Sequence, residues 1–158
     1  MKRQDPRPSD QGSPKAEPAL QKVIAALRKE LSECGDMLVL LDRQQKLILT
    51  RRPEALIENA ESMNTRIETL AAARSMRQRA SRELAEALGQ PAFSSFGHLL
   101  CLAPSEDQPL LKALVGAINS ILYHCQQRLL ENKLLLGPPP LELITSRTQG
   151  RSVLFGCN

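Results

Sequence analysis

The side chains of this sequence that could bind a metal are two histidines and four cysteines. His98 and Cys101 are three residues apart, and His124 is followed directly by Cys125. Zinc ligands must converge on one point, whereas adjacent residues of a helix project about 100° apart. Cys34 and Cys125 also fall on apolar helix positions, where a free cysteine packs as a small hydrophobic residue. We therefore interpret Cys34 and Cys125 as core residues and expect no metal site.

Sequence motifs that would indicate catalysis are missing. The chain has no GxGxxG, no Walker-type lysine loop, and no serine, histidine and aspartate in a nucleophile context. Neither histidine has a glutamate three residues before it, as the ligand pairs of di-iron helical bundles require. We expect a protein without enzymatic activity and without a cofactor.

The stretch 74–82 holds four arginines and no acidic residue, within a chain of formal net charge +4. Glu83 and Glu86 follow directly, so the pattern favours a solvated helix face over a dedicated binding patch. With no Trp and one Tyr, the sequence lacks the stacking aromatics typical of nucleic-acid interfaces. A basic helical bundle that binds nucleic acid stays open as a lesser alternative, and we expect no nucleic-acid partner. The arginines concerned are Arg74, Arg77, Arg79 and Arg82.

The composition points to packed helices. Of 158 residues, 42% are hydrophobic and 27 are leucine, whereas aromatic residues make up 3%. Leucine favours helices, and the aromatic and β-branched residues that favour strands are scarce. The apolar run at residues 37–41 is far shorter than the ~18 residues of a membrane span, and the N-terminus does not resemble a secretory signal. We expect a cytoplasmic protein that does not insert into membranes.

Proline and glycine divide the chain into three parts. Residues 1–17 are predicted to form a flexible N-terminal tail, residues 18–137 a helical bundle, and residues 138–158 a partly ordered C-terminal segment. Within the bundle we predict long helices over about 19–50 and 53–88, a short crossing helix between Pro91 and Pro104, and a third long helix that ends at Gly137. Ser105 and Gln108 are predicted to form a capping box at its start.

Each long helix carries an apolar seam. In the first helix the spacing alternates between four and three residues, which predicts a coiled seam. The fold class is therefore predicted as all-α, an elongated antiparallel bundle. The seams are Leu20, Ile24, Leu27, Leu31, Cys34, Leu38, Leu41 and Ile48 in the first helix; Leu56, Ala60, Met63, Ile67, Leu70, Ala73, Met76, Ala80, Leu84 and Leu88 in the second; and Leu111, Leu114, Ile118, Ile121, Cys125, Leu129, Asn132 and Leu136 in the third.

Near the C-terminus the chain has more apolar residues than one seam can use. Leucines at 129, 130 and 134–136 surround the last helix almost completely, which favours a protein-binding face, with a self-docked tail as the alternative. Asn132 interrupts this leucine seam. A polar seam residue usually fixes register or partner choice, although an asparagine facing solvent at a fraying helix end is an equal alternative.

The layout resembles the flagellar FlgN-type export chaperone family over residues 19–136. The resemblance rests on the long heptad helix, on Pro53-Glu54-Ala55-Leu56-Ile57, Ile67-Glu68-Thr69-Leu70, Arg79 and Leu84-Ala85-Glu86-Ala87-Leu88-Gly89, on the short leucine-rich turn, and on Asn132-Lys133-Leu134-Leu135, with an echo of the family's closing turn in Thr148-Gln149-Gly150. The chain departs from the family in one respect, because Gly137 and three prolines end the third helix where family members generally continue it.

The resemblance implies a cytosolic chaperone for hook-associated proteins, which form the junction between flagellar hook and filament. Such a chaperone covers the amphipathic terminal helices of its clients, prevents their premature polymerisation and delivers them to the flagellar type III export gate. Asn132 would set register or specificity. The expected client surface consists of Leu129, Leu130, Leu134, Leu135, Leu136, Leu141, Leu143, Ile144, Val153, Leu154 and Phe155.

The same stripes permit a second class of function. A coiled-coil scaffold or adaptor would associate with itself through them, and a homodimer is compatible with either interpretation. A scaffold predicts a tight oligomer that gains nothing from a client, whereas a chaperone predicts a complex that is lost when Leu134 and Leu135 become charged.

Overall fold

The computed structural model describes residues 15–137, and within them it contains helices but no strand. The predicted all-α fold, with two long helices, a short helix and a third long helix, is confirmed. The first helix begins three residues earlier than predicted, because Pro18 falls in its first turn, where proline is tolerated. The elements are α1 (Ala16–Leu49), α2 (Pro53–Ala87), α3 (Phe96–Leu102) and α4 (Gln108–Leu136).

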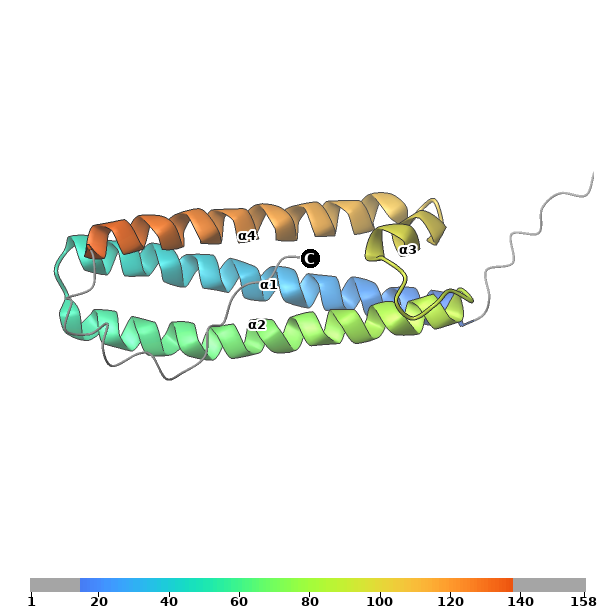
Figure 1. The fold of residues 1–158 in the computed structure, drawn as a ribbon, viewed down its shortest axis with the longest axis horizontal. Helices are drawn as coiled ribbons and strands as arrows, with labels where there is room; N and C mark the ends of the chain where they lie inside the picture. Colours follow the sequence, from blue (N-terminus) through green and yellow to red (C-terminus); the bar gives the residue numbers. More distant parts are fainter. Residues whose placement is uncertain (1–14, 138–158) are drawn as a thin grey trace, which may run out of the picture.

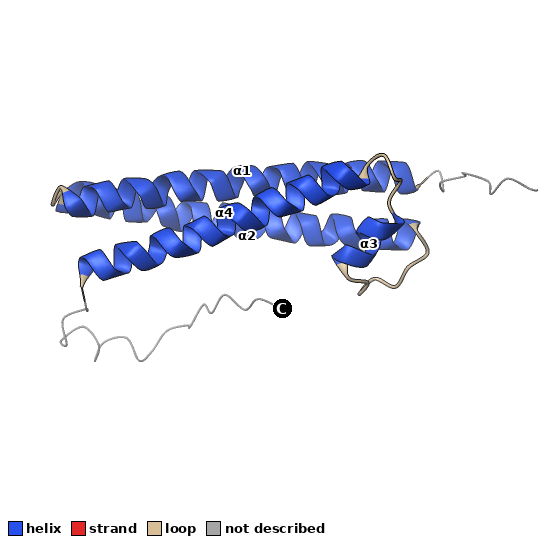
Figure 2. Ribbon diagram, turned by 90° about the horizontal axis from the view of Figure 1, so that it is seen from above, coloured by secondary structure: helices blue, strands red, loops and turns tan. Residues whose placement is uncertain are grey.

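The long helices form an elongated bundle in which α1 lies between α2 and α4 (Figure 1). α1 packs against both neighbours, whereas no Cα atom of α2 comes within 8 Å of a Cα atom of α4. Figure 2 shows that α4 crosses the other two long helices obliquely. α3 contacts α2 and α4 at one end of the bundle, which we call the α3 end. The α1–α2 turn and the last residues of α4 lie at the opposite end, which we call the turn end.

The apolar core is concentrated toward the α3 end. Its buried apolar residues come from 19–41 of α1, 70–85 of α2 and 111–118 of α4. Leu99 of α3 covers the end of this core and is itself 1% exposed. Because burying a leucine contributes about 2 kcal/mol, most of the apolar stabilisation lies at this end. The α3 end therefore positions the rest of the bundle.

The α2 face that contacts α1 differs from the predicted seam at several positions. Ile67 and Met76 are exposed. The adjacent residues Arg66 and Arg77 reach α1 instead, as does Asn59. Arginine can occupy such a position because its apolar stem packs against the neighbouring helix while its guanidinium meets a carboxylate. The seam prediction is wrong at Ile67 and Met76 for this reason.

Two buried glutamates of α1 hold α2 in place. The Nε atom of Arg77 lies 2.5 Å from Glu30 Oε2, and the Nε atom of Arg74 lies 3.4 Å from Glu30 Oε1. Arg66 Nη1 lies 2.5 Å from Glu33 Oε2. The interpretation of the arginine stretch as a solvated face is therefore wrong for Arg74 and Arg77, which tie α2 to α1.

Glu33 is held in its ionised form by three donors. Lys29 Nζ lies 2.6 Å from its Oε1 atom, Arg66 binds its Oε2 atom, and the hydroxyl of Thr69 donates to Oε2 over 2.8 Å. These bonds, with the one from Lys29 the strongest, lower the pKa of Glu33 to about 2, although burial acts in the opposite direction. The Glu33 carboxylate is thus a stable charged link between α1 and α2.

The helices α1 and α2 each end in a hydrogen-bonded turn of the same type, formed by different residues. In each turn the residue after the C-cap adopts a left-handed conformation: Arg51 with φ 53° and Gly89 with φ 65°. The amides of Arg52 and Gln90 then bond back to carbonyls of the last helical turn at 3.0 and 2.8 Å. Glycine takes this conformation without steric cost, whereas arginine does not. The predicted end of the second helix at Gly89 is confirmed.

The predicted capping box before α4 is wrong. Asp107, and not Ser105, precedes the first helical residue, and no side chain caps the helix there. The Nε2 atom of Gln108 instead donates to the backbone oxygens of Ala103 and Cys101 at 3.0 and 3.4 Å. Gln108 therefore satisfies carbonyls at the end of α3, which leaves it no role in a reciprocal cap.

Candidate functional site

The last two turns of α4 expose leucine side chains at the turn end. Leu134 is the most exposed, at 74% of its surface. The other members are exposed from 36% to 55%, and together these residues are named the leucine end of α4. It comprises Leu129, Leu130, Leu134, Leu135 and Leu136. The remaining residues of the expected client surface, Leu141, Leu143, Ile144, Val153, Leu154 and Phe155, lie outside the described residues.

Helical spacing distributes these leucines over more than one face. Leu129 and Leu136 are seven residues apart and share a face, whereas Leu130 and Leu134 share another. Asn132 faces α1, with Leu129 and Leu136 on one side of it and Leu135 on the other. Leu130 and Leu134 therefore lie on the opposite face of α4, turned away from α1.

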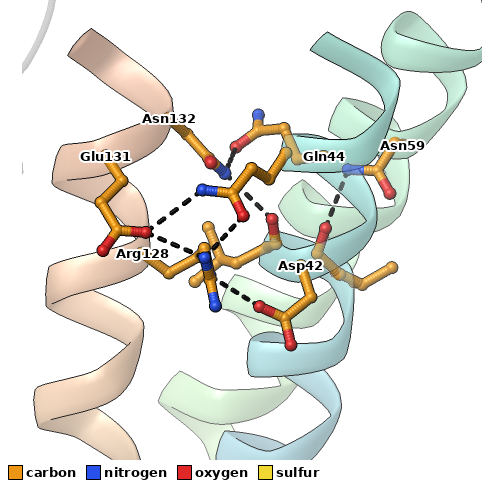
Figure 3. Close-up of polar contacts among 9 residues, drawn as sticks. Asp42, Gln44, Asn59, Arg128, Glu131 and Asn132 are labelled. Atoms are coloured by element: carbon orange, nitrogen blue, oxygen red, sulfur yellow. Dashed lines mark hydrogen bonds and ion pairs between the residues drawn. The ribbon is translucent and has the colours of Figure 1, made fainter. Parts of the chain in front are cut away.

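Asn132 anchors the leucine end to α1 (Figure 3). It is 1% exposed, so the alternative in which it faces solvent is wrong. Its Nδ2 atom donates to the carbonyl oxygen of Leu41 over 2.9 Å and to Gln44 Oε1 over 2.8 Å. Because these partners lie on one turn of α1, Asn132 fixes where α4 sits along α1.

Asn59 of α2 makes the corresponding contact on the other side of α1. Its Nδ2 atom donates to the carbonyl oxygen of Leu40 over 3.2 Å, and the side chain is fully buried. Figure 3 shows Asn59 and Asn132 reaching α1 from opposite sides. Sequence reasoning missed Asn59 because it assigned the adjacent Ala60 to the seam. Asn59 lies four residues before Met63, a residue of the predicted seam, so the two share a helix face. This spacing is the signal that could have revealed Asn59.

A cluster of charged and amide groups, centred on Arg128, lies one helical turn before Asn132. Arg128 Nε lies 2.7 Å from Asp42 Oδ1, and Arg128 Nη1 donates to Gln45 Oε1 over 2.6 Å. The same nitrogen lies 2.9 Å from Glu131 Oε2 (Figure 3). These groups are partly exposed, and pairs of this kind contribute about 0–1 kcal/mol. They orient the helix more than they stabilise it.

The thiols at the α1–α4 interface are poor nucleophiles and poor metal ligands. The Cys125 thiol donates to the carbonyl oxygen of Cys34 over 3.8 Å. Burial raises the pKa of the Cys34 thiol to about 11, and it also raises the pKa of Cys125. His98 lies on α3 beside Gln90, 3.3 Å from its Oε1 atom. Within residues 15–137, no three potential metal-ligating side chains of His, Cys, Asp or Glu come together.

Two further findings bear on the surroundings of the site. In the described part of the chain, no helix is long and apolar enough to cross a membrane. In comparisons with known proteins, no family model, curated protein or solved structure matches the chain.

Proposed function

We propose that this protein is a cytosolic export chaperone of the FlgN type, which binds an amphipathic terminal helix of a hook-associated flagellar subunit and delivers the subunit to the flagellar export gate. The observation that carries the proposal is the leucine end of α4, where Leu134 is 74% exposed beside four further exposed leucines. Large exposed apolar patches on soluble proteins mark interaction sites, so five exposed leucines at one helix end support a protein-binding role.

The leucine end suits a helix as its ligand. An amphipathic helix presents apolar residues at intervals of three and four, and these can pack between leucines that are similarly spaced on α4. Binding hides the client's apolar stripe and so prevents polymerisation before export. Binding of a client helix in this way needs no nucleotide and no catalytic group.

Asn132 has a supporting role in this proposal. Its two hydrogen bonds to α1 set the register of α4, and with it the position at which Leu130 and Leu134 stand relative to α1. A client helix would then meet a fixed arrangement of leucines. Specificity for hook-associated subunits would depend on this arrangement.

Self-association through the same leucines is the competing function. A nucleic-acid function has less support, because Arg74 and Arg77 are already paired with the buried carboxylate of Glu30. A scaffold and a chaperone differ in what they bind, so one binding experiment separates them.

The experiment measures the binding of a purified hook-associated subunit to the full chain by isothermal titration calorimetry. A variant with Leu134→Glu and Leu135→Glu should weaken binding at least about tenfold, because it places two charges in the apolar contact. The matched control is Ile67→Glu with Met76→Glu, which adds two charges at exposed apolar positions of α2. We expect the control to bind like the wild type.

Sedimentation of the same proteins tests the competing function. If the wild type forms a tight oligomer that does not bind the subunit, and the Leu134→Glu, Leu135→Glu variant is monomeric, the chaperone proposal is wrong. The protein is then a self-associating scaffold. A chain that ends at Gly137 shows whether residues 138–158 add to the affinity for the subunit.

A further inference from the structure

A strongly exposed aromatic side chain lies at the α3 end, far from the leucine end. Phe93 belongs to the loop between α2 and α3, and it is 90% exposed. Figure 1 places this loop at the opposite end of the bundle from the end of α4. The chain has only three phenylalanines, so an exposed Phe93 keeps a large part of the chain's aromatic surface out of the core. Interfaces, by contrast, are enriched in exposed aromatic residues of this kind.

A hollow of about 230 Å³ adjoins Phe93. Two cations, two hydroxyls and two aromatic rings line it, and no carboxylate does so. We call it the Phe93 hollow. Ligand pockets for whole small molecules usually measure roughly 300–1,000 Å³, so this volume fits one or two side chains. These groups belong to Arg77, Arg82, Ser81, Ser94, Phe93 and Phe96, and Gln78 and Ala92 complete the lining.

The two arginines of the hollow have different roles. Arg77 is fixed, since its Nε atom binds Glu30 and its guanidinium carbon lies 5.9 Å from the centre of the Phe96 ring. Arg82 is exposed and makes no ion pair within residues 15–137. The nearby carboxylate of Glu83 is engaged by Lys22 at 2.7 Å. Glu30 is shared between two arginines, so the hollow keeps a positive charge.

We propose that the Phe93 hollow is a docking site for an acidic peptide segment of a second protein, one that carries an apolar side chain among its carboxylates. The apolar side chain packs between the Phe93 and Phe96 rings, and a carboxylate pairs with Arg82. The Ser94 hydroxyl donates to an oxygen of the peptide, whereas the Ser81 hydroxyl already donates to the backbone oxygen of Arg77 over 2.8 Å. This site is independent of the leucine end, so the protein would hold two partners at once, one at each end of the bundle.

A membrane surface fits the same features less well. Stable adsorption to a bilayer requires a row of apolar side chains along one face together with many cations. The hollow offers one protruding ring and one unpaired arginine, which suit a single inserted side chain. A peptide is therefore the occupant that the geometry favours.

The test uses the full chain and two fluorescein-labelled hexapeptides, each with Leu-Phe at its centre. Four acidic residues flank the pair in the first peptide, and four lysines flank it in the second. Fluorescence anisotropy should show the acidic peptide binding with a Kd on the order of 100 μM and the basic peptide not binding. Phe93→Ala and Arg82→Glu should each weaken the binding of the acidic peptide at least about tenfold.

The matched control is Arg79→Glu, an exposed arginine of α2 that does not line the hollow. We expect it to change the Kd less than twofold, and Leu134→Glu to leave it unchanged. Phe93 is almost fully exposed, so Phe93→Ala should keep the wild-type melting temperature. Binding that falls equally in Arg79→Glu and Arg82→Glu overturns the proposal, because charge alone then explains it.

Three other results also overturn it: no binding of the acidic peptide at millimolar concentration, a dimer that dissociates in Phe93→Ala, or adsorption to vesicles with 30% anionic lipid that depends on Phe93. The last two would assign the hollow to a second copy of the chain or to a lipid surface. Loss of client binding in Leu134→Glu, with peptide binding intact, would separate the two ends functionally.

Discussion

At the α3 end, the three long helices bury leucines in a core whose end is covered by α3. At the turn end, the same helices are joined by asparagine and arginine side chains. Leu111 is 1% exposed and Leu134 is 74% exposed, although both belong to α4. One end uses its apolar residues to stabilise the fold, and the other leaves them at the surface. The bundle can therefore lend the leucines of the turn end to a partner without losing its core.

Leucine-to-alanine substitutions at the two ends of α4 give the largest expected contrast. Leu111→Ala should lower the free energy of unfolding by about 2–5 kcal/mol, because it opens a cavity in packed surroundings. Leu134→Ala should change it by less than about 0.5 kcal/mol, since its side chain is already in water. Urea denaturation followed by circular dichroism measures both. Equal losses at the two positions would show that the leucine end is part of the core.

Glu33, which lies between the two ends along α1, should give an effect that depends on pH. Its pKa is lowered from 4.5 to about 2 in the folded chain, so the ionised carboxylate stabilises the fold above pH 4.5, and this contribution is lost as pH falls from about 4.5 to about 2. Glu33→Gln should therefore cost about 2 kcal/mol at pH 7 and much less at pH 2.5.

The measurement is the free energy of unfolding of both proteins between pH 2.5 and pH 7. Glu68→Gln is the matched control, because Glu68 is exposed on α2 and makes no ion pair in the described part of the chain. Its difference from the wild type should be small at every pH. A cost of Glu33→Gln that stays constant with pH would mean that the side chain's shape, and not its charge, is what α2 requires.

The architecture could be predicted from the sequence because it depends on periodicity and on helix breakers. The leucine spacing of α1 requires a partner on one face, and Gly89 and Gly137, each followed closely by proline, mark the ends of α2 and α4. The surplus leucines after residue 128 could be seen in the same way, since one helix face cannot bury them all. These features are local in the sequence.

The register of α2 could not be predicted, because polar residues occupy part of its seam. Arg66, Arg77 and Asn59 face α1 only because Glu33, Glu30 and a backbone carbonyl are there to meet them. A hydrophobicity pattern cannot anticipate partners that are more than 15 residues away. The Phe93 hollow was missed for the same reason, as its two sides come from separate segments.

The smallest expected effect comes from the two turns that end α1 and α2. Both place a residue in the left-handed conformation, but the turn end uses Arg51 where the α3 end uses Gly89. Arg51→Gly should stabilise the protein by about 0.5–1 kcal/mol by relieving the strain of a side chain in this conformation, and Gly89→Ala should destabilise it by about 1 kcal/mol. No heavy atom lies within 4 Å of a Cβ added at Gly89, so the cost there is conformational and not steric crowding. Differential scanning calorimetry should therefore show melting temperatures that move in opposite directions. If both variants are destabilised, Arg51 makes contacts through its side chain that outweigh the backbone strain, and the turn end is held more firmly than its exposed leucines imply.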